Sequence, residues 1–459
     1  MRQVKGDSHA AASCAEAAFS DAFRTRRLTA VELFCGAGGM ALGFEQAGFD
    51  VLAAVDLDPV HLAAHERNFP LCEPVCADVA DLRGDQLMDA ASRGWARRYP
   101  DLPFGAEIDC VFGGPSCQGF SVIGSRKHDD PRNALIAEFA RVIVELRPRW
   151  FVMENVPGIL GSQYRGILES FRQALQDGGY QVAVPWKLNA KDYGVPQERK
   201  RIFISGARVG ESLPSPPDRV MSVPTVAEAL RDLPHLSRFR TLRQRDSVRL
   251  SNGQLESMLG AQSEYVRRLN GTISNVNDLT DRRIWDSSWL TSVGITVHSE
   301  AVVQRFRQLR PGQRDETARL PRLDPDGQAP TLRAGTGRDH GSFTSARPVH
   351  YSSARVITVR EAARLHGFPD WFGFHATKWH GFRQVGNSVP PPLARVVAAT
   401  VTTAAALQLT RRRGDPLKLG SDALLSMSLT DAAEHYRLSS TQLPVNVRGP
   451  ATTLCAPTA

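Results

Sequence analysis

Short apolar runs alternate with segments of helical periodicity over roughly the first 210 residues of the chain. Apolar runs bounded by turn residues are typical of buried strands, and apolar residues spaced three and four apart are typical of helices. The predicted strands are residues 28–34, 51–58, 108–114, 150–158 and 201–207. The predicted helices, the first preceded by a turn, are residues 36–48, 59–69, 134–148 and 168–179. This alternation predicts an α/β fold with a doubly wound, mostly parallel sheet.

The alternation stops near Glu211, where a proline-rich stretch is typical of a linker. From there to about residue 320 the chain is polar and irregular, and it contains five closely spaced arginines between Arg238 and Arg249. Regular patterns resume at residues 354–368, and residues 393–409 predict a strong helix.

The ends of the chain show neither strand nor helix patterns of comparable strength. We expect a flexible leader over residues 1–27 and a poorly ordered tail over residues 413–459.

The charge balance points to an anionic partner without identifying it. The formal net charge is +8, and only seven of the 56 basic residues are lysines. Arginine binds phosphates and guanine edges in a bidentate manner, which suits nucleic acid. An arginine-rich genome would produce the same bias, so charge alone leaves the partner open.

Cysteine usage and hydropathy indicate the cellular compartment in which the protein is expected to work. The seven cysteines are scattered, their number is odd, and no C-x-x-C pair occurs. We therefore expect neither a disulfide framework nor a zinc site, and no metal. Because we find neither an apolar signal segment nor a membrane-spanning run, we expect a cytoplasmic protein without membrane contact.

A glycine-rich segment, F-C-G-A-G-G at residues 34–39, follows the first predicted strand. Glycines there allow a ligand to approach the backbone at the start of a helix. The next strand ends in V-D-L-D, and its Asp56 lies where an acid can accept hydrogen bonds from ribose hydroxyls. These residues predict a nucleoside-type cofactor; by themselves they leave NAD and S-adenosylmethionine both open.

Reactive side chains follow three later strands. Cys117 lies in a Gly/Pro loop after residues 108–114, and Glu154 lies near the end of another strand. Arg199 and Arg201 are two residues apart beside a further strand, so both are expected on one face. Ligands bind at the carboxyl edge of such sheets, where a thiolate is a candidate nucleophile.

These motifs resemble those of the DNA (cytosine-5) methyltransferases, and they occur in that family's order. The matching segments are F-C-G-A-G-G, V-D-L-D, A-D-V, G-P-S-C-Q-G-F-S, E-N-V, Q-E-R-K-R, R-L-D-P-D-G-Q-A-P-T-L-R-A-G and R-Q-V-G-N-S-V-P-P-P-L-A. They cover roughly residues 28–210 and 320–400, and the poorly matched interval falls where this family keeps its variable target-recognition region.

The resemblance implies a role for each matching position. Cys117 would be the nucleophile and Glu154 the acid, while Arg199 and Arg201 would be the arginines of the catalytic motif. The cofactor would be S-adenosylmethionine, in contact with Phe34, Gly36, Gly38, Gly39, Asp56, Leu57, Asp78, Val79, Asn387 and Val389.

Two positions depart from the usual family pattern. Ser116 stands where a proline normally precedes the nucleophile, which removes a fixed φ angle and adds a backbone N–H. Leu57 stands where some members have an aromatic residue that stacks on adenine, so apolar packing would replace stacking there.

The resemblance also predicts a domain arrangement. Residues 28–210 and 380–412 would form the catalytic domain, of the Rossmann-like type found in S-adenosylmethionine-dependent methyltransferases. Residues 211–379 would form a small inserted domain, with target recognition mainly over 211–320.

The expected enzyme is a monomeric, sequence-specific DNA cytosine-C5 methyltransferase that acts on double-stranded DNA. It would be the modification enzyme of a restriction–modification system, with a restriction endonuclease acting separately. Two alternatives stay open: a tRNA cytosine-C5 methyltransferase and a catalytically silent DNA-binding regulator.

Overall fold

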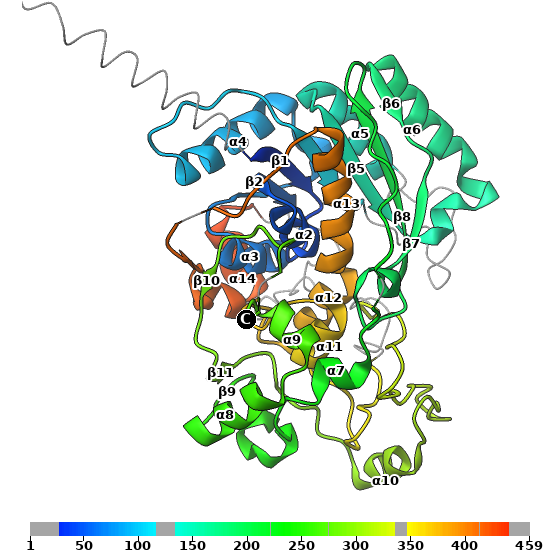
Figure 1. The fold of residues 1–459 in the computed structure, drawn as a ribbon, viewed down its shortest axis with the longest axis vertical. Coiled ribbons are helices and arrows are strands. Elements are labelled where there is room, and N and C mark those ends of the chain that lie inside the picture. The colour runs from blue at the N-terminus through cyan, green and yellow to red at the C-terminus, as the bar shows by residue number, and fades with distance from the viewer. Residues whose placement is uncertain are drawn as a thin grey trace, which may run out of the picture.

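The computed structural model describes residues 27–115, 134–220, 222–273, 275–335, 347–412 and 414–439 (Figure 1). Its main sheet has eight strands. They are β1 (Leu28–Leu33), β2 (Phe49–Asp56), β3 (Glu73–Cys76), β4 (Cys110–Gly113), β5 (Trp150–Asn155), β6 (Tyr180–Val182), β7 (Trp186–Asn189) and β8 (Lys200–Arg208). The order is β3-β2-β1-β4-β5-β8-β6, and β7 also pairs with β8.

The first five strands of this order are parallel, and β8 runs antiparallel to β5, β6 and β7. The chain changes direction of winding between β1 and β4, which are neighbours in the sheet but not in sequence. The predicted α/β fold with a mostly parallel sheet is therefore confirmed. The crevice at the carboxyl ends of β1 and β4 is the usual ligand position in such a sheet.

Helices cover both faces of the sheet (Figure 1). One face carries α2 (Gly39–Gln46), α3 (Pro59–Asn68) and α13 (Pro391–Ala404), and the other carries α4 (Gly84–Arg98), α5 (Ala134–Leu146) and α6 (Arg165–Asp177). Side chains along β5 alternate between the two layers, as the period of a strand requires. Trp150 and Val152 pack with the first layer, whereas Phe151 and Met153 pack with the second.

Local signals explain where several helices begin. Asp58 caps α3 by accepting the N–H groups of Val60 and His61, and Pro59 occupies the first helical position. The helix α11 (Val359–His366) begins with a capping box between Thr358 and Glu361.

Among the strands and α-helices that the structure describes within residues 28–210, four were not predicted from the pattern, namely β3, β6, β7 and α4. The strand β3 contains Glu73 and Pro74 and is only partly buried, because it lies at an edge of the sheet. An edge strand lacks the continuous apolar run of a central strand, so its pattern is weak.

The segment expected to be polar and irregular forms short elements (Figure 1, lower part), and residues 236–295 contain a small core of their own. These are α7 (Val226–Leu230), α8 (Asn252–Ala261), α9 (Glu264–Leu269), α10 (Glu300–Gln308) and the strand pair β9 (Val248–Arg249) and β11 (Trp289–Leu290). The core residues are Leu236, Leu242, Leu250, Met258, Leu290, Val293 and Ile295. The elements are too short to give a periodic signal.

The expectation of a poorly ordered tail is wrong for residues 414–439. They form β12 (Leu417–Lys418), which pairs with β10 (Arg283–Ile284), a 3₁₀ helix η9 (Asp422–Ser426) and α14 (Leu429–His435). Polar contacts anchor this segment to α3: Tyr436 donates to Glu66 at 2.7 Å, and Arg67 donates to Asp422 at 2.9 Å. Leu424, Ala432 and Ala433 are also buried, but elements this short give no periodic signal in the sequence.

The described residues contain no helix with the length and apolar character that crossing a membrane requires. Residues 1–26 and 440–459, which hold most of the expected leader and the rest of the expected tail, lie outside the described residues.

Candidate active site

The glycine-rich loop lies between β1 and α2, at the carboxyl edge of the sheet. Phe34, Gly36 and Gly38 have φ angles of 58°, 56° and 94°, so the chain folds back sharply here. A Cβ atom at Gly36 would meet nothing within 4 Å, whereas one at Gly38 would lie 2.3 Å from the ring of Phe69. The loop therefore packs on α3 on one side and leaves its backbone open at Gly36.

Asp56 ties the loop to the end of β2. Its carboxylate accepts the N–H of Gly36 at 2.7 Å and the N–H of Asp58 at 2.8 Å. Burial raises the pKa of Asp56, and the nearby His61 opposes this rise. The acid expected to bind ribose thus also holds the shape of the loop.

Leu57, Asp78 and Val79, which are also expected to contact the cofactor, differ in how exposed they are. Leu57 is partly exposed, and Asp78 caps the 3₁₀ helix η1 (Val79–Asp81) by accepting the N–H of Ala80 at 3.0 Å. Val79 is buried as a whole residue, and its carbonyl oxygen accepts from Arg141 at 2.9 Å.

The C-terminal part of the chain completes this region. Asn387 ends α12 (Lys378–Asn387) and is exposed, while Val389 is buried. A Cβ atom at Gly39 would lie 2.6 Å from the carbonyl oxygen of Val389 and 2.7 Å from Cβ of Ser388. Ser388 and Val389 therefore lie directly against the start of α2, and the absence of a side chain at Gly39 leaves room for them.

Glu154 and Arg201 form an ion pair where β5 and β8 lie side by side. Nε of Arg201 lies 2.8 Å from Oε1 of Glu154, and each side chain is 12% exposed. Burial raises the pKa of Glu154 above its usual value, and Arg201 and Arg199 oppose the rise. The balance leaves a carboxyl group that gains a proton more readily than a solvated one.

The loop of the candidate nucleophile begins beside this pair. A Cβ atom at Gly114 would lie 2.8 Å from Oε2 of Glu154, and Asn155 donates to the carbonyl oxygen of Pro115 at 3.3 Å. Cys117 and Ser116 lie outside the described residues. The last described residues before Cys117, Gly114 and Pro115, therefore lie beside Glu154 and Asn155.

Arg199 makes different contacts from those expected of a base-binding arginine. Its guanidinium donates to the carbonyl oxygens of Leu332 at 2.8 Å, Gly386 at 2.7 Å and Ser388 at 2.9 Å. The side chain is buried, with 1% exposed. The two arginines of the motif therefore have different roles. Arg201 pairs with the carboxylate, and Arg199 binds the backbone of two segments, at Leu332 and at residues 386–388.

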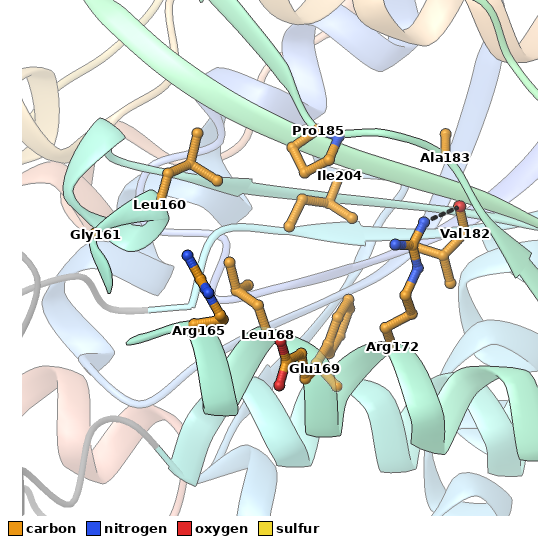
Figure 2. Close-up of a pocket in the computed structure, with 11 residues that line it drawn as sticks. Leu160, Gly161, Arg165, Leu168, Glu169, Arg172, Val182, Ala183, Pro185 and Ile204 are labelled. Carbon is orange, nitrogen blue, oxygen red and sulfur yellow. Dashed lines mark hydrogen bonds between the residues drawn. The ribbon is translucent and has the colours of Figure 1, made fainter. Parts of the chain in front are cut away.

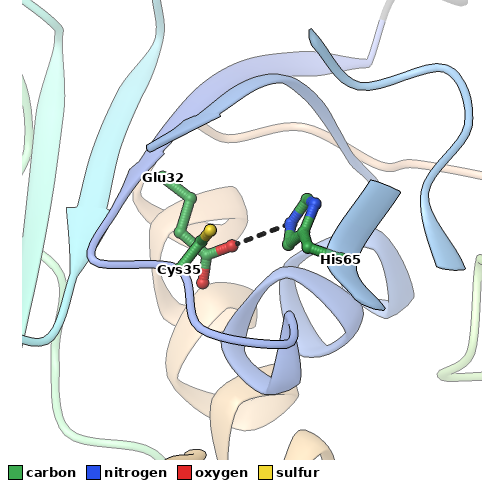
Figure 3. A group of neighbouring side chains, drawn as sticks. All are labelled: Glu32, Cys35 and His65. Atoms are coloured by element: carbon green, nitrogen blue, oxygen red, sulfur yellow. Dashed lines mark ion pairs between the residues drawn. The ribbon is translucent and has the colours of Figure 1, made fainter. Parts of the chain in front are cut away.

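A buried polar cluster under the glycine-rich loop was not found from the sequence. Glu32, Cys35 and His65 place their polar atoms within 4.8 Å of one another (Figure 3). Nε2 of His65 lies 3.4 Å from Oε2 of Glu32. Burial raises the pKa of Glu32 and Cys35 and lowers that of His65 to about 3, which favours the neutral form of each group. They are of the types that bind zinc, yet burial opposes the deprotonated forms that a metal needs. Only the packing of α3 on the loop brings them together.

A cavity of about 220 Å³ lies between α6 and the strands β6 and β8 (Figure 2). Its lining is mainly apolar, from Leu160, Leu168, Phe171, Val182, Pro185 and Ile204. None of the described residues expected in the active site lines it.

Comparisons with known proteins agree with these motifs. The family model for C-5 cytosine-specific DNA methylases matches residues 28–403. The chain is 46% identical over 412 residues to the Type II methyltransferase M.XorII of Xanthomonas oryzae pv. oryzae (strain KACC10331 / KXO85), covering 90% of this chain and 93% of that protein. It is 32% identical over 383 residues to the Type II methyltransferase M1.HphI of Haemophilus parahaemolyticus, covering 82% and 86%.

A solved structure agrees as well. A crystal structure from E. coli, described as a prophage-encoded DNA modification methyltransferase, matches with a TM-score of 0.64 at 33% identity, covering 83% of this chain and 99% of that one. The chain therefore belongs to the C-5 cytosine-specific DNA methylases, which transfer a methyl group to C5 of cytosine in DNA.

Proposed function

We propose that this enzyme methylates a cytosine flipped out of duplex DNA, with S-adenosylmethionine as methyl donor and Cys117 as nucleophile. The strongest support is the Glu154–Arg201 ion pair at the carboxyl end of β5. It lies beside Gly114 and Pro115, from which the chain runs directly into Cys117.

The loop after β1 fits a nucleoside cofactor. Space beyond the Cβ position of Gly36 leaves the backbone approachable, and the Asp56 carboxylate lies at the edge of this space. The bound cofactor supplies an electrophilic methyl group. We assign its contacts to Phe34, Gly36, Gly38, Gly39, Asp56, Leu57, Asp78, Val79, Asn387 and Val389.

The chemistry requires a nucleophile because C5 of cytosine is itself a weak one. Addition of the Cys117 thiolate to C6 forms an S–C6 bond and makes C5 enamine-like. Glu154 in its protonated form donates to N3 and stabilises the electron pair displaced there. Arg201 binds O2 and orients the ring. After C5 has been methylated, loss of its proton and expulsion of the thiolate restore the aromatic ring.

Access to C6 requires base flipping, because C6 cannot be reached inside a stacked duplex. We assign target recognition to residues 211–320, within a small domain of residues 211–379. The catalytic domain then comprises residues 28–210 and 380–412. The packing of α13 on α2 supports the inclusion of residues 380–412, since it joins the N-terminal and C-terminal parts of the chain.

The relatives support a proposal for the biological setting. Because several are Type II methyltransferases, we infer a modification enzyme that acts as a cytoplasmic monomer and protects DNA from a separate restriction endonuclease. Methyl transfer to tRNA alone would contradict this proposal, as would DNA binding without any transfer.

Replacement of Cys117 tests the mechanism. We expect Cys117→Ala to lose methyl transfer and covalent capture by DNA containing 5-fluorocytosine, while DNA binding is retained. Cys110→Ala, which removes a buried thiol from β4, is the matched control and keeps both activities. Normal methyl transfer by Cys117→Ala would contradict the proposed nucleophile.

A further inference from the structure

Three segments that are distant in sequence meet at the buried side chain of His366: the end of α11, the segment of Gln197 and the segment of Ser388. His366 ends α11 and is fully buried. Its Nδ1 lies 3.0 Å from Nε2 of Gln197, and its Nε2 lies 2.9 Å from the carbonyl oxygen of Ser388. Nε2 of Gln197 also donates to the carbonyl oxygen of Leu365.

The hydrogen bonds fix the tautomer of His366. The N–H of Leu332 donates to Oε1 of Gln197 at 3.0 Å, so the amide nitrogen of Gln197 must face the histidine. An amide nitrogen only donates, and therefore Nδ1 of His366 accepts and carries no proton. The carbonyl oxygen of Ser388 only accepts, and therefore Nε2 carries the proton. Burial also lowers the pKa of His366, which favours the neutral ring.

The same carbonyl oxygen links His366 to both halves of the active site. Ser388 accepts from His366 and from Arg199, and the neighbouring Val389 packs against Gly39 in the glycine-rich loop. On the other side, Arg199 precedes Arg201 by two residues, and Arg201 is paired with Glu154.

We infer that His366 is a positioning residue that couples the cofactor loop to the base-binding carboxylate, through the carbonyl of Ser388 and the side chain of Gln197. The inference rests on the proposed function. It assigns to α11 a part in the reaction, in addition to its packing against α7 and α12.

Two substitutions separate positioning from general stability. Leucine at position 366 keeps the apolar volume but loses both hydrogen bonds. Glutamine can keep both, because its amide oxygen accepts and its amide nitrogen donates. His350 offers matched controls, His350→Leu and His350→Gln: it is also buried, and its Nδ1 accepts backbone N–H groups of Ser352 and Ser353 away from these residues.

The measurements are the melting temperature, the equilibrium Kd for S-adenosylmethionine, and the rate of covalent capture by 5-fluorocytosine DNA at saturating cofactor. Loss of a buried hydrogen-bond partner is expected to weaken cofactor binding about tenfold and to slow capture about tenfold in His366→Leu. His366→Gln is expected to restore both to within about threefold of the unmodified enzyme.

The outcome is decisive in either direction. If His366→Leu lowers the melting temperature as His350→Leu does, but leaves Kd and capture unchanged, His366 is only structural and the inference is wrong. Failure of His366→Gln to restore either value would also overturn it. If the unmodified enzyme itself gave no capture, the proposed function would have failed instead.

Discussion

At the scale of single residues, the site depends on a carboxyl group held between two opposing influences. Burial favours the protonated form of Glu154, and the guanidinium of Arg201 at 2.8 Å favours the ionised form. Because the pKa is raised, a larger fraction of Glu154 is protonated near neutral pH than in a solvated glutamate. A group that must donate to N3 of cytosine benefits from this shift.

We expect Glu154→Gln to lower the rate of methyl transfer about 10²-fold or more, because the amide cannot exchange a proton with the base. The unmodified enzyme should lose activity as pH rises through the raised pKa of Glu154, since the donor is then ionised. The rate of the Gln variant should not follow this decline, because its amide does not titrate. Rates measured across pH at saturating cofactor and DNA test this.

Glu211→Gln is the control for this prediction. Glu211 forms a comparable pair with Arg149, Nε to Oε1 at 2.8 Å, outside the site. Its replacement should leave the rate and its pH dependence unchanged. A Glu154→Gln variant with the same pH profile as the unmodified enzyme would refute the role of Glu154 as proton donor.

At the scale of elements, the contact between α2 and α13 joins the N-terminal and C-terminal parts of the chain. It depends on Gly43, where a Cβ atom would lie 2.4 Å from Cβ of Ala394 and 2.6 Å from the backbone nitrogen of Arg395. Glycine normally weakens a helix by roughly 1 kcal/mol relative to alanine, so its presence here reflects the close approach of α13.

Gly43→Ala is therefore expected to destabilise the protein, by about 1–3 kcal/mol, because the backbone of α13 cannot yield without moving the helix. Gly260→Ala in α8 should instead stabilise it by several tenths of a kcal/mol, since a Cβ atom there meets nothing within 4 Å. Chemical denaturation of both variants measures the difference. Equal changes in the free energy of unfolding for the two variants would show that close packing of α13 on α2 does not exclude a side chain at Gly43.

At the scale of the whole molecule, α8 and the strand pair β9 and β11 lie at the end away from α4 (Figure 1). Arg238, Arg240, Arg243 and Arg245 are exposed on the short elements around Leu236 and Leu242. Within the described part of the chain, these four arginines form no ion pair with an acidic side chain. Unpaired arginines are suited to contacts with phosphates.

Replacing Arg240 and Arg243 together by alanine is expected to weaken DNA binding. The slope of log K against log salt concentration should fall by about 1 for each replaced arginine that binds a phosphate in the unmodified enzyme. Arg93→Ala on α4, a 57% exposed arginine, is the control. Binding titrations at several salt concentrations provide the slopes. An unchanged slope in the double variant would remove these arginines from the DNA interface.

Much of the catalytic fold could be predicted, and the failures have a common physical origin. The buried strands β1, β2, β4 and β5 were found because both of their faces are covered, which requires continuous apolar runs. The edge strand β3 and the segment at residues 414–439 were missed because polar contacts, such as that of Tyr436 with Glu66, hold them in place.

The sequence by itself determined the family, the order of its motifs and the reactive groups of the site, because short local segments carry this information. Only the tertiary structure decided how Arg199 and Arg201 differ, although they are two residues apart. It also decided that His366 bonds to Gln197 and Ser388. Local patterns encode which side chains are buried, but the partner of a buried polar group depends on which distant backbone segments the fold brings to it.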